Sequence, residues 1–296
     1  MKTIGIIGLG DMGIGLARNI LSAGFELTGF DLREERLVEL EKLGGVRAAD
    51  PQGVAAASVA VFVMVLNGTQ AKDAIFGENG LIHKLDAGDT VIISATITPA
   101  EMRDIAAGLQ AKDIAVIDTP VSGGKSGADS GTLTLMTAAK KDVLEDNRPV
   151  LEAVSAKLFH VGEEIGQGQT VKAALQAFIG TSFTAIFESL VLGSAAGIPG
   201  KTLFEVFGAS GVSSPLFRNC AELILDRKFK GTGSHIGTMY KDLGITMQMA
   251  RECGAAMFST AAAYELFQAG ISLFPEEDNW SIVKLLEQIA GAKVEW

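Results

Sequence analysis

Lys172 and Gln176, one helical turn apart in a long apolar run, are the residues of this chain best suited to proton chemistry. A lysine in such a run is costly unless it is paired, solvated in a cleft or deprotonated. An amine removed from water can exchange a proton with a hydroxyl or carbonyl oxygen, and Gln176 shares its helix face. The alternative is that Lys172 reaches solvent from the start of the helix and has no chemical role.

A glycine-rich turn near the N-terminus suits phosphate binding. Gly8-Leu9-Gly10-Asp11-Met12-Gly13 follows an apolar strand at 4–7. Gly8 permits the tight turn, Gly10 lets a pyrophosphate approach the backbone, and Gly13 allows the next helix to pack on the strand. The helix start adds unpaired N–H groups and a positive dipole end. The pattern therefore predicts a dinucleotide site.

Asp31 follows the second predicted strand, at the distance where an acid is expected to bind the adenosine ribose. Its carboxylate can accept hydrogen bonds from both ribose hydroxyls and would repel a 2′-phosphate, which favours NAD over NADP. Arg33 weakens this preference, because a guanidinium can accommodate that phosphate. The alternative role of Asp31 is to cap the next helix.

Two further loops follow predicted strands. In Asp118-Thr119-Pro120-Val121-Ser122-Gly123-Gly124, the N–H groups around Ser122, Gly123 and Gly124 can form a nest for a substrate carboxylate. In Ala95-Thr96-Ile97-Thr98-Pro99, a hydroxyl and backbone amides could meet the nicotinamide. The alternative for the first loop is an ordinary turn. The alternative for the second is that Thr96 or Thr98 only caps the helix that begins at Pro99.

The elements that position these residues fall into two groups. Short apolar strands alternate with helices over residues 1–162, which predicts a doubly wound α/β domain with a parallel sheet covered on both faces. Residues 163–296 show helical periodicity alone and predict an all-α domain. The active site is then expected at the carboxyl ends of the strands. We expect strands at 4–7, 27–30, 59–65, 90–93, 115–117, 133–136 and 158–161, and helices in the second domain at 170–196, 201–207, 214–226, 239–253, 259–269 and 281–290.

The helix expected at 170–196 joins the two domains and is apolar nearly all round. We expect it to be a central buried helix or a subunit interface. Gln176, Thr181 and Glu188 interrupt its apolar run, which argues against a membrane span.

Composition excludes several classes of function. The chain has 296 residues, enough for two cores, and 25 basic against 35 acidic residues give a net charge of −10, which disfavours a nucleic-acid partner. The 2 cysteines and 3 scattered histidines suit neither a disulfide framework nor a metal site. The N-terminal apolar run is too short for a signal peptide. We expect a cytoplasmic protein with no metal and no membrane partner.

Four motifs in order resemble those of the β-hydroxyacid dehydrogenase family, which includes the 3-hydroxyisobutyrate dehydrogenases. They are the glycine turn at 8–13, the loop at 118–124, Gly166-Gln167-Gly168-Gln169-Thr170-Val171-Lys172 and Lys241-Asp242-Leu243. The resemblance covers essentially the whole chain. It implies a Rossmann domain followed by a 6-phosphogluconate dehydrogenase-like all-α domain that mediates oligomerisation, hence a homodimer or homotetramer.

The resemblance also implies site residues. Lys172 matches the catalytic lysine of the family. The substrate-binding positions are Ser122, Gly123, Gly124 and Gln176. The cofactor-binding positions are Gly8, Leu9, Gly10, Asp11, Met12, Gly13, Asp31, Leu66, Asn67, Thr96 and Lys241. Taken apart from the resemblance, Lys241 with Asp242 would usually be a surface ion pair that contributes little.

Departures from the family pattern point to the substrate. Gln176 replaces the usual asparagine, Ala95 replaces a serine, Asn67 a proline and Ser234 an aromatic residue. Asn67 and Ser234 make the expected cleft more polar, which fits a substrate with several hydroxyls. These features look most like the branch that oxidises C2 of a four-carbon sugar acid such as L-threonate, with NAD as cofactor.

Other functions remain open at this point. Within the family they are a tartronate-semialdehyde (2-hydroxy-3-oxopropionate) or related semialdehyde reductase and a 3-hydroxyisobutyrate dehydrogenase. Imine reductases share the architecture but place another residue at the position of Lys172. Lys230-Gly231-Thr232-Gly233 hints at a 6-phosphogluconate-type enzyme, although an ordinary turn explains it too. Outside enzymes, the same fold could serve as a nucleotide-sensing scaffold.

Overall fold

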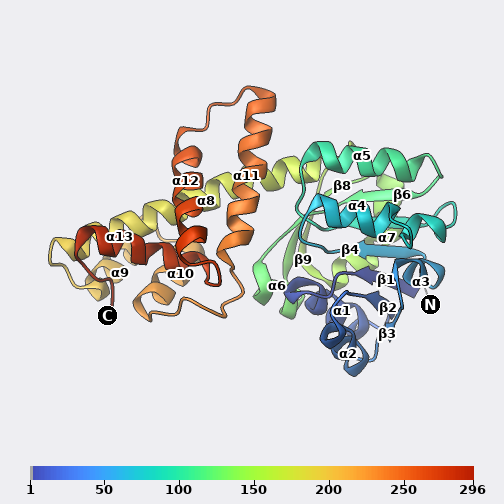
Figure 1. Ribbon diagram of the computed structural model, residues 1–296, viewed down its shortest axis with the longest axis horizontal. Coiled ribbons are helices and arrows are strands. Elements are labelled where there is room, and N and C mark those ends of the chain that lie inside the picture. Colours follow the sequence, from blue (N-terminus) through green and yellow to red (C-terminus); the bar gives the residue numbers. More distant parts are fainter. Residues whose placement is uncertain (1–2) are drawn as a thin grey trace. The chain divides into compact units, whose positions relative to one another are not determined.

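The computed structural model describes residues 3–296, in two compact units (Figure 1). The first unit ends at Lys172 and the second is Ala173–Trp296. One helix, α8 (Gln167–Ala195), runs through this division. The domain boundary that the sequence predicts after residue 162 stays a prediction.

The first unit contains a nine-stranded sheet with the order β3-β2-β1-β4-β5-β6-β8-β7, and β9 pairs with β8. Its strands are β1 (Thr3–Ile7), β2 (Glu26–Phe30), β3 (Val46–Arg47), β4 (Ala60–Val63), β5 (Thr90–Ile93), β6 (Ala115–Asp118), β7 (Val121–Ser122), β8 (Leu133–Ala138) and β9 (Ser155–Gly162). The six strands from β3 to β6 pair in parallel, in the doubly wound order. The predicted α/β class is therefore confirmed.

The sheet, which the sequence pattern predicts to be parallel, is mixed at one edge. β8 pairs antiparallel with β6 and β7, while β9 runs parallel to β8. After β6 the chain turns at Pro120 and adds β7 and the short helix α6 (Gly124–Ser130) before β8 runs back along β6. The two-residue strands β3 and β7 are too short to show a period of two, so the sequence pattern missed both.

Both faces of the sheet are buried, which explains the continuous apolar runs of its strands. Ile4, Ile6 and Phe62 belong to one core cluster, and the alternate positions Ile7 and Val61 belong to another. The first cluster includes residues of α1 (Asp11–Ser22), α2 (Glu34–Lys42) and α7 (Lys141–Ala153). The second includes residues of α3 (Pro51–Ala56), α4 (Gly68–Phe76) and α5 (Pro99–Gln110). In Figure 1, α4 and α5 accordingly lie on the opposite side of the sheet from α1 and α2.

The second unit is helical, as predicted. No strand is assigned in 163–296, all of which the structure describes, and only an isolated bridge joins His235 to Asp278. Its core gathers Phe183, Phe187, Phe267 and Trp280. After α8 come α9 (Gly200–Ala209), α10 (Pro215–Leu225), α11 (Ile236–Cys253), α12 (Phe258–Leu273) and α13 (Ile282–Ala290).

Helix α8 has 29 residues and is buried along only part of its surface. It packs Phe183 and Phe187 into the helical core, yet Phe178 and Leu192 are 70% and 72% exposed. Full burial within one chain is therefore wrong, and a subunit interface stays a prediction. Within 3–296, only α8 has the length and apolar composition to cross a membrane, a test that core helices of soluble proteins also pass.

Candidate active site

The glycine turn between β1 and α1 has the backbone that a dinucleotide site needs. Gly8 has φ +90°, which favours glycine, and a Cβ there would collide with the Met64 carbonyl oxygen. A Cβ on Gly13 would overlap the carbonyl oxygen of Gly8. At Gly10 the nearest atom to such a Cβ is Nη2 of Arg33, 3.5 Å away, so this side of the turn is open. The residues present thus fit a bound pyrophosphate.

Asp31 connects this turn to the end of β2. One carboxylate oxygen accepts a hydrogen bond from the Leu9 N–H (2.7 Å), and the other accepts from the N–H (2.9 Å) and Nε (3.1 Å) of Arg33. Burial by itself would raise the pKa of Asp31, but these hydrogen bonds outweigh it and lower the pKa. The N-cap of α2 is Arg33, so the capping role considered for Asp31 is wrong.

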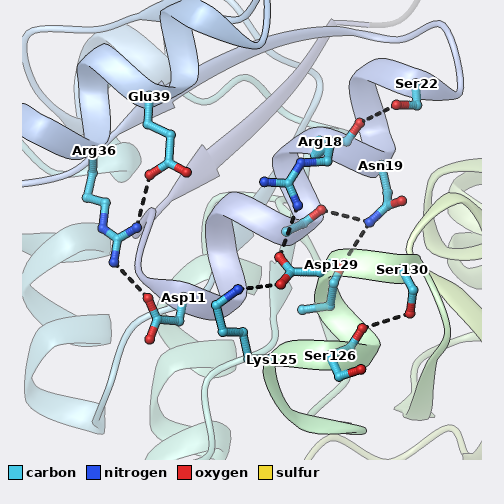
Figure 2. A network of polar contacts seen from close by, with 12 residues as sticks. Asp11, Arg18, Asn19, Ser22, Arg36, Glu39, Lys125, Ser126, Asp129 and Ser130 are labelled. Carbon is cyan, nitrogen blue, oxygen red and sulfur yellow. Dashed lines mark hydrogen bonds and ion pairs between the residues drawn. The ribbon is translucent and has the colours of Figure 1, made fainter. Parts of the chain in front are cut away.

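Helix α1, which follows the glycine turn, is tied to α6, which follows the predicted carboxylate loop (Figure 2). Arg18 pairs with Asp129 at 3.0 Å, and Lys125 pairs with the same carboxylate. Nδ2 of Asn19 donates to the Ala128 carbonyl at 2.7 Å. A Cβ on Gly15 would lie 2.7 Å from the Ala128 backbone, so glycine permits this close approach.

Asp11, at the exposed start of α1, makes a second set of contacts in Figure 2. Arg36 of α2 pairs with Asp11 at 2.7 Å and with Glu39 at 3.0 Å. The pair with Asp11 links α2 to α1, while the pair with Glu39 lies within α2. Cofactor contact by Asp11 and Met12 stays a prediction.

The carboxylate loop itself has backbone torsions that only glycine adopts readily. Gly123 has φ +132° and Gly124 has φ +59°, and both are exposed. Ser122 before them is half-buried at the end of β7. Binding of a carboxylate by Ser122, Gly123 and Gly124 stays a prediction.

Two threonines of the next loop have different roles. Thr98 caps α5 in a capping box with Glu101, at 3.1 Å from Oγ1 to the Glu101 N–H. The capping alternative is therefore confirmed for Thr98 and not for Thr96, which is half-buried. Asn67, expected to add polarity to the cleft, caps α4 by accepting the Gln70 N–H at 2.9 Å. Leu66 before it is 55% exposed.

A buried carboxylate that the sequence pattern did not single out holds the start of α8. Asp118 is fully buried at the end of β6, and its Oδ2 accepts the N–H groups of Gly166 (2.9 Å) and Gly168 (3.0 Å). Its Oδ1 accepts from Nε2 of Gln169 at 3.0 Å. The signal in the sequence was an aspartate that ends an apolar strand, together with the glycines of the motif at 166–172.

Lys172 lies on the first turns of α8 and is only 7% exposed. It therefore does not extend into solvent, which removes the simplest alternative to a chemical role. Gln176, four residues on along the same helix, is 5% exposed.

Within the second unit, Gln176 belongs to a buried polar cluster with α11. Its Nε2 donates to Oδ2 of Asp242 at 2.5 Å, and Lys241 pairs with Oδ1 of Asp242 at 3.0 Å. Oγ1 of Thr246 donates to the Ala173 carbonyl at 2.9 Å. Asp242 is 3% exposed, so the interpretation of this pair as a surface ion pair is wrong. Asp242 falls beside Met239 and Thr246 on the buried stripe of α11, a position that could have identified it.

Ser234 and the segment before it are held by the loop at 278–280. Nδ2 of Asn279 donates to the Ser234 hydroxyl at 2.9 Å. Thr232 donates to Asp278 from both its N–H (2.7 Å) and its hydroxyl (2.8 Å). The contacts of Thr232 account for the turn at 230–233 without a phosphate ligand. In residues 3–296, no group of three or more potential metal ligands is found.

Protonation of Asp118 gives a pH prediction for stability. Burial raises the pKa of Asp118 from 3.8 to about 6, against the hydrogen bonds from Gly166, Gln169 and Gly168. Between about pH 4 and 6 the unfolded chain has lost this proton while the folded chain keeps it, so this group's contribution to stability falls as the pH rises. Asparagine does not titrate, so only the wild type loses this contribution. The free energy of unfolding of Asp118→Asn minus that of wild type should therefore increase from about pH 4 to 7, by up to about 3 kcal/mol. Urea unfolding at about pH 4, 5.5 and 7 measures this difference, and a difference independent of pH would contradict it.

Comparison with protein families gives matches along nearly the whole chain. Residues 3–162 match the NAD-binding domain of 6-phosphogluconate dehydrogenase. Residues 166–286 match the NAD-binding domain of NADP-dependent 3-hydroxyisobutyrate dehydrogenase.

Individual proteins match over similar lengths. The chain is 32% identical to L-threonate dehydrogenase from Haemophilus influenzae, over 98% of this chain and 97% of that protein. It is equally 32% identical to 2-(hydroxymethyl)glutarate dehydrogenase from Eubacterium barkeri, with the same coverage of 98% and 97%. The crystal structure of 3-hydroxyisobutyrate dehydrogenase from Salmonella typhimurium superposes with a TM-score of 0.88 at 29% identity, covering 96% of this chain and 100% of that one.

Proposed function

Because the chain belongs to the β-hydroxyacid dehydrogenase family and is an NAD-dependent oxidoreductase, we propose that it oxidises C2 of a four-carbon sugar acid such as L-threonate. The observation that carries the catalytic part is the burial of Lys172, which is 7% exposed on α8. The name of the Haemophilus relative, at 32% identity, supports the choice of substrate.

Each group of residues has a role in the proposed reaction. The Ser122–Gly124 segment holds the substrate carboxylate, and Lys172 accepts the proton of the hydroxyl that is oxidised. The ammonium so formed stabilises negative charge on the substrate oxygen. Gln176 orients the substrate, and its own amide is fixed because Nε2 donates to Asp242.

NAD supplies the two-electron oxidant for this reaction when it is bound. The turn at 8–13 would hold its pyrophosphate. The Asp31 carboxylate, whose pKa is lowered further by its hydrogen bonds, would accept from the adenosine ribose. Leu66, Asn67, Thr96 and Lys241 would complete the cofactor site. Asn67 would do so through its backbone or its Nδ2, since its Oδ1 caps α4.

We also propose a cytoplasmic homodimer or homotetramer without nucleic-acid or membrane partners. The net charge of −10 disfavours binding to polyanions. Exposed Phe178 and Leu192 on α8 support an interface between copies of the chain.

A substrate panel tests the proposal. NAD and NADP reduction are measured with L-threonate, D-erythronate, glycerate, 3-hydroxyisobutyrate, L-serine and 2-(hydroxymethyl)glutarate. We expect kcat/KM for L-threonate with NAD to exceed the others by about tenfold or more, because a single group that is missing from or added to a fitted substrate changes discrimination by at least that order. D-Erythronate has the same hydroxyls and tests whether the site distinguishes their configuration. A preference for 3-hydroxyisobutyrate would replace the substrate proposal. Tight NAD binding without turnover of any acid would favour the nucleotide-sensing alternative.

A further inference from the structure

The side chain of Gln169 makes three hydrogen bonds inside the first unit. Gln169 is 1% exposed and lies on the first turn of α8. Its Oε1 accepts the Ile97 N–H at 3.1 Å, while its Nε2 donates to the Ala95 carbonyl at 3.1 Å and to Oδ1 of Asp118 at 3.0 Å. Both amide donors and one acceptor position are therefore used.

Two of these bonds enclose Thr96. The carbonyl of the residue before and the N–H of the residue after an extended residue point to the same side, where a neighbouring strand would normally bind them. After β5 ends at Ile93, the Val63 carbonyl of β4 accepts the N–H groups of Ser94 and Ala95. The carboxamide of Gln169 then binds the Ala95 carbonyl and the Ile97 N–H. The backbone on either side of Thr96 is thereby fixed.

Asp118 anchors the other end of the arrangement. It accepts backbone N–H groups at the start of α8 as well as the Gln169 side chain. The close approach depends on Gly168, because a Cβ there would lie 2.6 Å from the Met136 carbonyl oxygen and 2.8 Å from that of Asp118. The start of α8 thus packs against the backbone of Asp118 in β6 and Met136 in β8. Lys172 follows Gln169 by three residues on this helix.

We infer that Gln169 is a positioning residue for the oxidation, which locks the loop carrying Thr96 to the helix turn that carries Lys172, with Asp118 as the fixed anchor. This inference rests on the proposed roles of Lys172 and Thr96. The amine that takes the proton and the loop expected at the nicotinamide then share one rigid support. Without the tie each can move independently, and misplacement of about 1 Å can lower a rate about 100-fold.

Gln169→Met tests the inference, because it keeps the length of the side chain and removes its hydrogen bonds. The matched control is Thr137→Val, which breaks the buried 2.8 Å hydrogen bond between Thr119 and Thr137 beside Asp118 without touching the loop. Three quantities are measured for each: kcat per NAD-binding site, the Kd for NAD alone, and amide hydrogen exchange at 94–98 and 166–169.

We expect Gln169→Met to lower kcat by about 10- to 100-fold, with a much smaller change in the Kd for NAD. Exchange should accelerate at Ile97 and at the start of α8, and Thr137→Val should show neither effect. If Gln169→Met does not fold, Gln169→Ser, whose shorter side chain cannot make the three hydrogen bonds and adds no charge beside Asp118, is expected to show the same loss of kcat.

The inference fails if kcat is unchanged, if only the Kd for NAD changes, or if Thr137→Val lowers kcat equally. Failure of the proposed function is separate. In that case Lys172→Ala keeps its turnover, while hydrogen exchange still reports whether Gln169 holds the loop.

Discussion

Lys172→Ala is expected to lower kcat by about 10³- to 10⁵-fold, since it removes both the proton acceptor and the charge that stabilises the substrate oxygen. The affinity for NAD should change little, because the turn at 8–13 and Asp31 are left intact. Lys172 is 7% exposed, so the substitution removes a buried group and the loss of kcat cannot be attributed to a change in surface charge. Steady-state oxidation of the best acid in the panel and titration of NAD in its absence measure the two effects.

Two further variants separate chemistry from charge. Lys172→Arg keeps a cation but cannot give up its proton near neutral pH, so its kcat should also be very low. Lys201→Ala removes an exposed lysine of α9, whose side chain is 68% exposed, and should behave as wild type. Turnover of Lys172→Ala within a few-fold of wild type would show that another group takes the proton.

Gly10→Ala should weaken NAD binding and leave stability unchanged, whereas Gly13→Ala should lower stability. At Gly10 a Cβ meets only Nη2 of Arg33 at 3.5 Å, and the backbone is extended with φ −60°, so the variant should fold normally. Its methyl group occupies the side of the turn that a pyrophosphate would approach, so the Kd for NAD should rise by about 10- to 100-fold, the loss of one or two good contacts. Gly13→Ala forces a Cβ onto the Gly8 carbonyl and should lower the free energy of unfolding by about 3 kcal/mol.

The control for this pair is Gly24→Ala. Gly24 has φ +88°, but a Cβ added there would meet no atom within 4 Å, so this variant tests backbone strain without overlap. We expect it to cost about 1 kcal/mol and to leave NAD binding unchanged. Urea unfolding measures the free energy of unfolding of the three variants, and NAD titration measures their Kd for NAD. Wild-type NAD affinity in Gly10→Ala would remove the turn from the cofactor site.

The sequence by itself determined the features that depend on near neighbours in the chain. The strand, glycine turn and helix over 3–22 follow from local sterics and from hydrophobic periodicity, as do the helices of the second unit. Burial of the strands on both faces followed from their continuous apolar runs. The motif order along the chain was enough to indicate the family, because each motif combines residue types whose physical roles are local.

Only the tertiary structure decided which polar groups meet. The Gln169 side chain bonds residues 72 and 74 positions away, and Gln176 bonds Asp242 across 66 positions. A hydrophobic period shows that a position is buried, but not which donor lies opposite it. The antiparallel edge at β8 was missed for the same reason. Pairing of distant segments is fixed by the packing of the whole unit, and a buried polar group takes whatever partner that packing brings within about 3 Å.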